Sequence, residues 1–166
     1  MVSWGRGSAS WASSYVMKNL ALLTLLLAGC GGATPSLARV ERVVDGDTIL
    51  VRIDGRSERV RYIGVDTPES VKPGTRVQCF GKAAAAANRR LVAGREVRLE
   101  YDAEARDRYG RLLAYVYRDE LLVNAELIRQ GYGKPLEIAP NVAHAAELRR
   151  LAVSARRAHR GLWSRC

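Results

Sequence analysis

Two short acidic motifs, separated by one predicted β-hairpin, have the residue types best suited to chemistry. The first is DGDT at residues 45–48, and the second is DTPE at residues 66–69. Carboxylates gathered at one place repel one another unless a cation lies among them. Their oxygens are hard ligands, which suit calcium or magnesium better than zinc. With Arg61 between the motifs, the pattern suits metal-assisted attack on a phosphodiester.

The hairpin is the element that must bring the two motifs together. The runs TILVRI at residues 48–53 and SERVRYI at residues 57–63 alternate apolar and polar side chains, which predicts two strands. Asp54-Gly55 between them is a favoured two-residue turn, because glycine adopts positive φ at little cost. A hairpin brings its outer ends together, so Asp47 is expected near residues 66–69. Either motif alone is typical of a solvated turn.

The remaining patterns complete one small domain of five strands and three helices. Further strands are expected over residues 38–44, 96–101 and 112–118, and helices over 80–92, around 123–128 and over 145–155. The strands are mostly antiparallel, and their pattern permits either a small barrel or a sandwich.

A third motif, DRYGR at residues 107–111, precedes the last of these strands. With it the chain resembles the staphylococcal nuclease (thermonuclease) family. The matching pieces are VVDGDT, VRYIGVDTPE, DRYGRLLAYVY, VNAELIRQGYGK and a terminal GLW, in the family order over about residues 38–163. The resemblance implies an α+β fold, in which a five-stranded OB-type β-barrel packs with three α-helices, in a staphylococcal-nuclease-like domain over residues 37–166.

The resemblance also implies roles for eight residues. Those that match the family's catalytic groups are Arg61, Glu69 and Arg111, and those that match its calcium ligands are Asp47, Asp66 and Thr67, the last through its backbone carbonyl. Two positions that match phosphate contacts are Arg108 and Tyr109. In contrast, Asp45 is interpreted as a residue of the Asp-Gly turn.

The function that the resemblance implies is that of a calcium-dependent endonuclease, acting as a monomer. It would hydrolyse DNA and RNA, single-stranded or locally opened, with little sequence specificity, and leave 3′-phosphate ends. One departure concerns the connector at residues 135–140 (PLEIAP), which lacks two tyrosines that help hold a nucleotide in the family.

Net charge agrees with a polyanionic partner but does not prove one. The chain carries a formal charge of +10. Arg6 and Lys18 are the only charged residues among residues 1–29, so the rest of the chain carries +8. Such a balance favours attraction to phosphates. A merely soluble basic protein has the same property.

The first 29 residues are predicted to be a signal peptide of the lipoprotein type. A ten-residue apolar run at residues 20–29 follows Met17-Lys18, and it is too short to span a bilayer, which needs about 20 residues. The motif LAGC at residues 27–30 resembles a lipobox, so Cys30 is expected to become the lipidated first residue, with residues 30–36 as its tether. This predicts a protein anchored to a membrane of the bacterial cell envelope. An ordinary signal peptide, which gives a secreted protein, is the alternative.

The two remaining cysteines, Cys79 and Cys166, are a candidate disulfide in an oxidising compartment. Two free thiols are the alternative at this stage.

Two functions other than an active nuclease are compatible with an OB-type barrel. One is a non-catalytic nucleic-acid-binding module on the cell envelope, and the other is a secreted module for a ligand such as an oligosaccharide. The retained carboxylates and arginines favour the active enzyme over both.

Overall fold

The computed structural model describes residues 36–70, 74 and 77–166. All of them belong to the unit that runs from residue 32 to residue 166. The predicted signal peptide, Cys30 and nearly all of the tether lie outside the described residues. Within the described ranges, no helix is long and apolar enough to cross a membrane.

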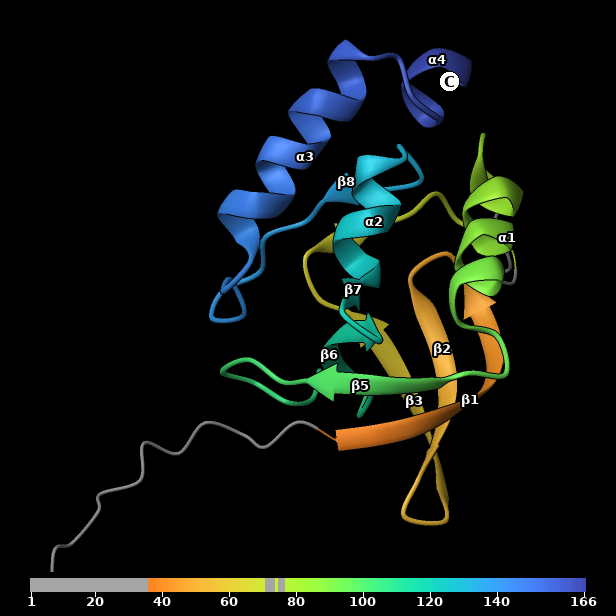
Figure 1. Cartoon of the computed structure of the whole chain (residues 1–166), viewed down its shortest axis with the longest axis vertical. Helices are drawn as coiled ribbons and strands as arrows, with labels where there is room; N and C mark the ends of the chain where they lie inside the picture. Colours follow the sequence, from red (N-terminus) through yellow and green to blue (C-terminus); the bar gives the residue numbers. More distant parts are fainter. Residues whose placement is uncertain (1–35, 71–73, 75–76) are drawn as a thin grey trace, which may run out of the picture. The chain divides into compact units, whose positions relative to one another are not determined.

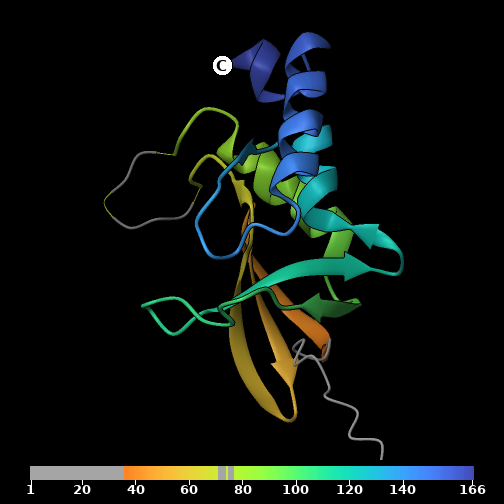
Figure 2. The same ribbon diagram turned by 90° about the vertical axis from the view of Figure 1, so that its left-hand side faces the viewer.

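Five strands form a closed barrel, as predicted (Figures 1 and 2). They are β1 (Ser36–Asp45), β2 (Thr48–Ile53), β3 (Arg56–Tyr62), β5 (Glu96–Glu100) and β6 (Leu112–Arg118). Their order is β3-β2-β1-β5-β6, and β6 pairs back onto β3 to close the ring. The core inside is rich in Val, Ile and Leu and includes Tyr62, whose pKa burial raises.

The β2–β3 hairpin forms with the predicted turn. Asp54 and Gly55 both adopt positive φ, 49° and 77°, and Ile53 pairs with Arg56 across them. Successive side chains of a strand point to opposite faces of the sheet, so the alternating apolar and polar residues of the sequence face the core and the solvent in turn. At the other end of the hairpin, Thr48 pairs with Arg61 on the outer face.

The pairing that closes the barrel is parallel, and it decides where two arginines point. Residues 60–62 of β3 pair with residues 112–114 of β6, so Arg61 lies opposite Leu113. Arg111 stands two residues before Leu113 and therefore points to the same side of the sheet. Arg61 and Arg111, fifty residues apart in sequence, thus share the outer face of the barrel.

Three helices gather at one end of the barrel, which confirms the predicted number of main helices (Figure 1). They are α1 (Gly81–Val92), α2 (Val123–Arg129) and α3 (Ala145–Arg157). Helix α2 is fixed to the barrel by buried Asn124, which accepts a hydrogen bond from the Val116 amide (2.9 Å) and donates one to the Ile63 carbonyl (2.8 Å).

Several very short elements escaped prediction. They are β4 (Val65–Asp66), β7 (Leu121–Leu122), β8 (Lys134–Pro135) and the one-turn helix α4 (Leu162–Arg165). Elements of two to four residues are too short to show a hydrophobic period, so the sequence gives no local signal for them. Strand β4 pairs with β8, and this ladder attaches the connector after α2 to the segment that carries the second acidic motif.

Buried Asn88 of α1 holds the turn between β1 and β2. Its Nδ2 donates to the Asp45 carbonyl (2.9 Å), and its Oδ1 accepts the Tyr62 hydroxyl hydrogen (2.9 Å). Because leaving the buried side-chain amide of Asn88 without hydrogen bonds would cost free energy, these two bonds fix α1 relative to the first acidic motif.

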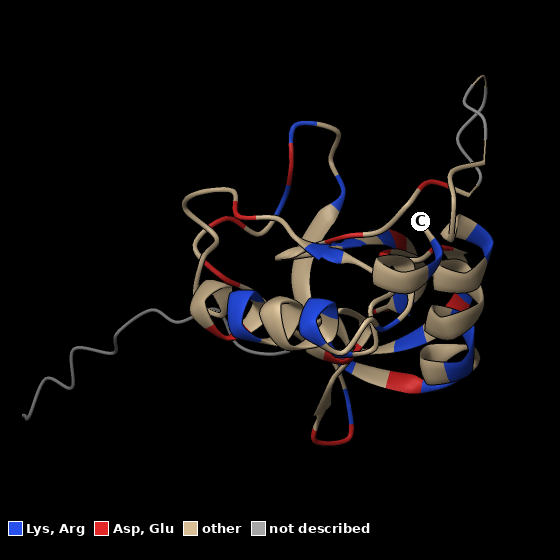
Figure 3. Cartoon of the chain, turned by 90° about the horizontal axis from the view of Figure 1, so that it is seen from above, with Lys and Arg blue, Asp and Glu red and all other residues tan. Residues whose placement is uncertain are grey.

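Positive charge is spread over the helices as well as the barrel loops (Figure 3). Helix α3 carries basic side chains along its exposed side, with Glu147 as its one acid: Arg149, Arg150, Arg156 and Arg157. The basic surface is therefore wider than any single site.

Candidate active site

An open pocket of about 950 Å³ lies on the outer face of β1, β2 and β3. Its lining includes all six residues that match the family's catalytic groups and calcium ligands: Asp47, Arg61, Asp66, Thr67, Glu69 and Arg111. Tyr109 lines it too, whereas Arg108 does not. The folded chain thus brings together the residues that the sequence singled out, while their roles stay predictions.

Asp47 links the two acidic motifs directly. It is only 6% exposed, and its Oδ2 accepts hydrogen bonds from the Thr67 amide and hydroxyl, both at 2.8 Å. Gly46 makes this approach possible, since a Cβ there would lie 2.6 Å from the Thr67 hydroxyl oxygen. The expectation that the hairpin brings Asp47 to residues 66–69 is therefore correct.

Arg61 lies between two carboxylates. It forms ion pairs with Asp47 and with Asp66, the latter at 2.9 Å, and its side chain is only 15% exposed. Burial lowers the pKa of Arg61, as does the charge of Arg111, whereas Asp66 raises it. Because the ordinary pKa of a guanidinium lies far above neutral pH, Arg61 stays charged there.

Asp45 does more than complete a turn, which corrects the interpretation from sequence. Its buried Oδ1 accepts a hydrogen bond from the Gly46 amide (2.8 Å), as expected for the turn, and another from the Ser70 hydroxyl (2.5 Å). Ser70 follows Glu69 directly, so Asp45 anchors the chain beside the candidate base. The contact spans 25 residues and leaves no periodic signal in the sequence.

The DRYGR motif forms a tight loop around one carboxylate. Asp107 accepts hydrogen bonds from the amides of Tyr109 (2.9 Å) and Arg111 (3.0 Å), and its Oδ2 accepts one from Arg111 Nε (2.7 Å). Burial alone would raise the pKa of Asp107, but these hydrogen bonds hold it below its ordinary value. Asp107 therefore fixes the direction of the Arg111 guanidinium.

Tyr109 and Arg108 stand at the border with a second cavity of about 570 Å³. Tyr109 is 67% exposed, and the Arg108 guanidinium carbon lies 4.8 Å from its ring centroid. The connector that lacks the two tyrosines forms another wall of this cavity and presents Leu136 and Ile138. The two cavities share Arg61, Tyr109 and Arg111 and are therefore continuous.

Two further arginines in the pocket were not recognised from the sequence. Arg42 of β1 and Arg59 of β3 both pair with Leu50 of β2, so they share the outer face. An outward arginine on an alternating strand is usually just solvated, and only the closed barrel places these two beside the acidic motifs.

The donor set fits a calcium ion. Asp47 and Asp66 already face one common cation, the Arg61 guanidinium, and both supply hard oxygen ligands. Among the described residues no cluster of three or more His, Cys, Asp or Glu side chains could hold a metal. The ligand set that the family resemblance implies has only two such side chains, because its third ligand would be the Thr67 carbonyl.

A closed five-stranded barrel with helices packed at one end is an OB-type domain, a fold that binds oligonucleotides or oligosaccharides in many proteins. A family model described as "Staphylococcal nuclease homologue" matches residues 59–165. The chain belongs to the staphylococcal nuclease family.

Relatives support this assignment over most of the chain. A thermonuclease of Staphylococcus hyicus is 40% identical over 137 residues, which cover 82% of this chain and 81% of the relative. A thermonuclease of Staphylococcus intermedius is 43% identical over 126 residues, covering 76% and 75%. Endonuclease YncB of Bacillus subtilis is 38% identical over 128 residues, covering 76% and 61%.

The depressed pKa of Asp107 predicts an acid-sensitive loop. Its contribution to stability is complete above the unfolded pKa of about 3.9 and is lost as the pH falls through the lower folded pKa. Asp107→Asn should therefore lower the free energy of unfolding by about 1–2 kcal/mol at pH 7, and by progressively less as the pH falls through the folded pKa. Denaturant titrations across this range measure the difference. Asp119→Asn, at a side chain that is 92% exposed, is the control and should be neutral throughout. A pH-independent difference for Asp107→Asn would contradict this account.

Proposed function

We propose that the chain is an endonuclease that hydrolyses phosphodiester bonds of DNA and RNA with little sequence specificity. The observation that carries the proposal is one open pocket whose lining includes Arg61, Arg111 and Glu69 together with the carboxylates of Asp47 and Asp66. Membership of the staphylococcal nuclease family and the relatives named thermonuclease and endonuclease support it.

The two arginines bind and stabilise the phosphate. A guanidinium offers two parallel N–H donors to two phosphate oxygens, and this contact strengthens as negative charge builds in the transition state. Arg61 is held by Asp47 and Asp66, and Arg111 is held by Asp107. Their directions are therefore set before substrate arrives, so little reorganisation is needed during the reaction.

Glu69 is the proposed general base. Its carboxylate accepts a proton from the attacking water, which requires a fixed position within hydrogen-bonding reach of that water. The neighbouring Ser70 is bonded to buried Asp45, and Thr67, two residues earlier, is bonded to Asp47. The segment that carries Glu69 is thus attached on both sides to the first acidic motif.

Calcium would be held by the Asp47 and Asp66 carboxylates and the Thr67 carbonyl. When bound, it supplies positive charge to the phosphate oxygens as a Lewis acid. Without it, the two carboxylates lie close to where a phosphate must bind, and among the described residues Arg61 is the cation that forms ion pairs with both.

The second cavity is the proposed place for a nucleotide base. Tyr109 offers an exposed aromatic face, and Leu136 and Ile138 offer an aliphatic wall. Stacking and apolar contact accept any base, which agrees with low sequence specificity. A base must leave a duplex to enter, so single-stranded or locally opened DNA and RNA are the proposed substrates. Products ending in 3′-phosphates are part of the same proposal, which chemical analysis of cleaved ends tests.

The catalytic assignments predict a loss of rate without a loss of fold. Arg61→Lys and Arg111→Lys should each lower kcat by about 100- to 1000-fold, because a point charge does not replace a two-donor fork. Glu69→Gln keeps the shape and removes the base, so it should lower kcat without changing the melting temperature. Cleavage of DNA and RNA is measured beside thermal melts, with Arg52→Lys on the exposed side of β2 as control. Near wild-type rates for Arg61→Lys and Glu69→Gln would place the active centre elsewhere.

The metal assignment is tested best at Asp66. Its side chain is 58% exposed and bonds only to Arg61 among the described residues, whereas Asp47 also supports the fold. Asp66→Asn should raise the calcium concentration for half-maximal activity by about tenfold or more, because a neutral amide binds calcium less well. Calcium titrations with a chelator baseline, followed by activity and by calorimetry, measure the shift. An unchanged calcium requirement would remove Asp66 from the ligand set.

A lipid anchor on the cell envelope is the proposed localisation. It rests on the LAGC motif at residues 27–30, which lies outside the described residues. Cys30→Ser in the full chain should move the protein from the membrane fraction to the soluble fraction, or stall its processing. Fractionation with labelling by a fatty-acid analogue is the measurement. Unchanged partitioning without any label would favour the ordinary signal peptide and a secreted enzyme.

A further inference from the structure

Gln78 holds both main-chain polar groups of Glu69. Its side-chain Oε1 accepts a hydrogen bond from the Glu69 amide (3.0 Å), and its own amide donates to the Glu69 carbonyl (2.9 Å). Such a reciprocal pair fixes the orientation of one peptide segment more firmly than either bond alone. The Cα atom that carries the candidate base is therefore positioned by a residue nine places further along the chain.

Gln78 itself lies in a turn that packs closely on Glu69. The Gln78 carbonyl accepts a hydrogen bond from the Gly81 amide (3.0 Å), which begins α1. A Cβ at Gly81 would lie 2.5 Å from the Glu69 carbonyl oxygen, so only glycine permits this approach. The turn thus leaves Glu69 little room to move while Gln78 stays in place.

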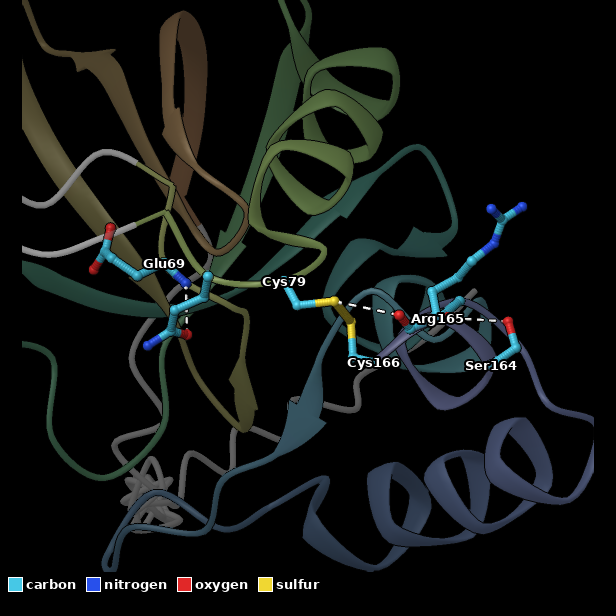
Figure 4. Close-up of a disulfide and its surroundings, with 7 residues drawn as sticks. Glu69, Cys79, Ser164, Arg165 and Cys166 are labelled. Carbon is cyan, nitrogen blue, oxygen red and sulfur yellow. Dashed lines mark hydrogen bonds between the residues drawn. A yellow bond between two sulfur atoms is a disulfide. The ribbon is translucent and has the colours of Figure 1, made fainter.

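A disulfide fastens the same turn to the end of the chain. Cys79, the residue after Gln78, is bonded to Cys166, with their Cα atoms 6.0 Å apart (Figure 4). The far end of this link is itself anchored. The Cys166 amide donates to the Leu162 carbonyl (3.0 Å), and the Leu162 amide donates to the Gly131 carbonyl (2.9 Å). A continuous series of bonds therefore runs from the body of the domain to Glu69.

We propose that Gln78 is a positioning residue for Glu69, and that the Cys79–Cys166 disulfide keeps Gln78 in place. Reduction of this disulfide then loosens the Glu69 segment and lowers turnover while the barrel stays folded. Both cysteines are exposed, so a dithiol reagent reaches them. The reagent supplies two electrons and two protons, the S–S bond becomes two thiols, and the reagent becomes a disulfide. Only the effect on turnover rests on the proposed nuclease function.

The first test does not depend on activity. Amide hydrogen exchange at Glu69 is measured in the purified full chain, oxidised and reduced, and in Gln78→Leu. Loss of the acceptor or of the disulfide should speed exchange at Glu69 by about tenfold or more, while amides of the β-barrel core stay protected. Unchanged exchange at Glu69 in the reduced protein would overturn the proposal, whatever the nuclease assay gives.

The second test is kinetic. Gln78→Leu should lower kcat by about tenfold and leave KM within about twofold, because it displaces the base rather than the phosphate contacts. Gln78→Glu keeps an acceptor oxygen and should restore most of the rate. Reduction should lower kcat of the wild type but have little further effect on Gln78→Leu, since both act through one link. Fully additive effects would contradict that link.

Matched controls separate this device from general destabilisation. Gln130→Leu introduces the same apolar side chain at the other glutamine of the chain, which is half-buried where Gln78 is exposed, and it should leave kcat unchanged. The double variant Cys79→Ser with Cys166→Ser should reproduce the reduced state without reagent. All assays are run well below the melting temperature of the least stable form. An oxidised wild type that binds but does not cleave nucleic acid would refute the proposed function, while the exchange data alone would still decide the positioning role.

Discussion

The parallel pairing of β3 with β6 is the constraint on which the rest of the structure depends. It closes the barrel and so removes the two exposed edges of the sheet, where unpaired backbone groups would otherwise meet solvent or other chains. The same register places Arg61 opposite Leu113 and turns Arg111 to the same outer face. One ladder of hydrogen bonds therefore closes the core and also places the two arginines on the same side of the pocket.

Four charged groups of the pocket are held in place by ion pairs or by hydrogen bonds to neighbouring segments. Arg61 is paired with Asp47 and Asp66, and Arg111 is paired with Asp107. The buried carboxylate of Asp47 also binds the Thr67 segment through two hydrogen bonds, and that of Asp45 binds Ser70. Such charge-assisted bonds are strong, and they fix directions before any ligand binds. The first acidic motif thus lines the pocket and also holds the segment of the second motif in place through hydrogen bonds.

Two features lie in the surroundings of the pocket. The connector before α3 presents Leu136 and Ile138 to the second cavity, at the place where the family resemblance led us to expect two tyrosines. The disulfide between Cys79 and Cys166 joins the turn before α1 to the end of the chain, 87 residues away. Both act on the surroundings of the pocket, and neither alters the arginines and carboxylates within it.

The sequence by itself determined the local parts, and the tertiary structure decided how they meet. Alternation and the Asp54-Gly55 turn predicted the β2–β3 hairpin, and a hairpin necessarily brings Asp47 to the second motif, because both lie close to it along the chain. Alternation alone permitted a sandwich, and only family resemblance pointed to the barrel. The contacts of Asp45 with Ser70, of Gln78 with Glu69 and of β4 with β8 had no signal in the sequence. They join residues of no fixed period through one or two hydrogen bonds or through two-residue ladders, and such contacts form only when the folded chain places both partners side by side.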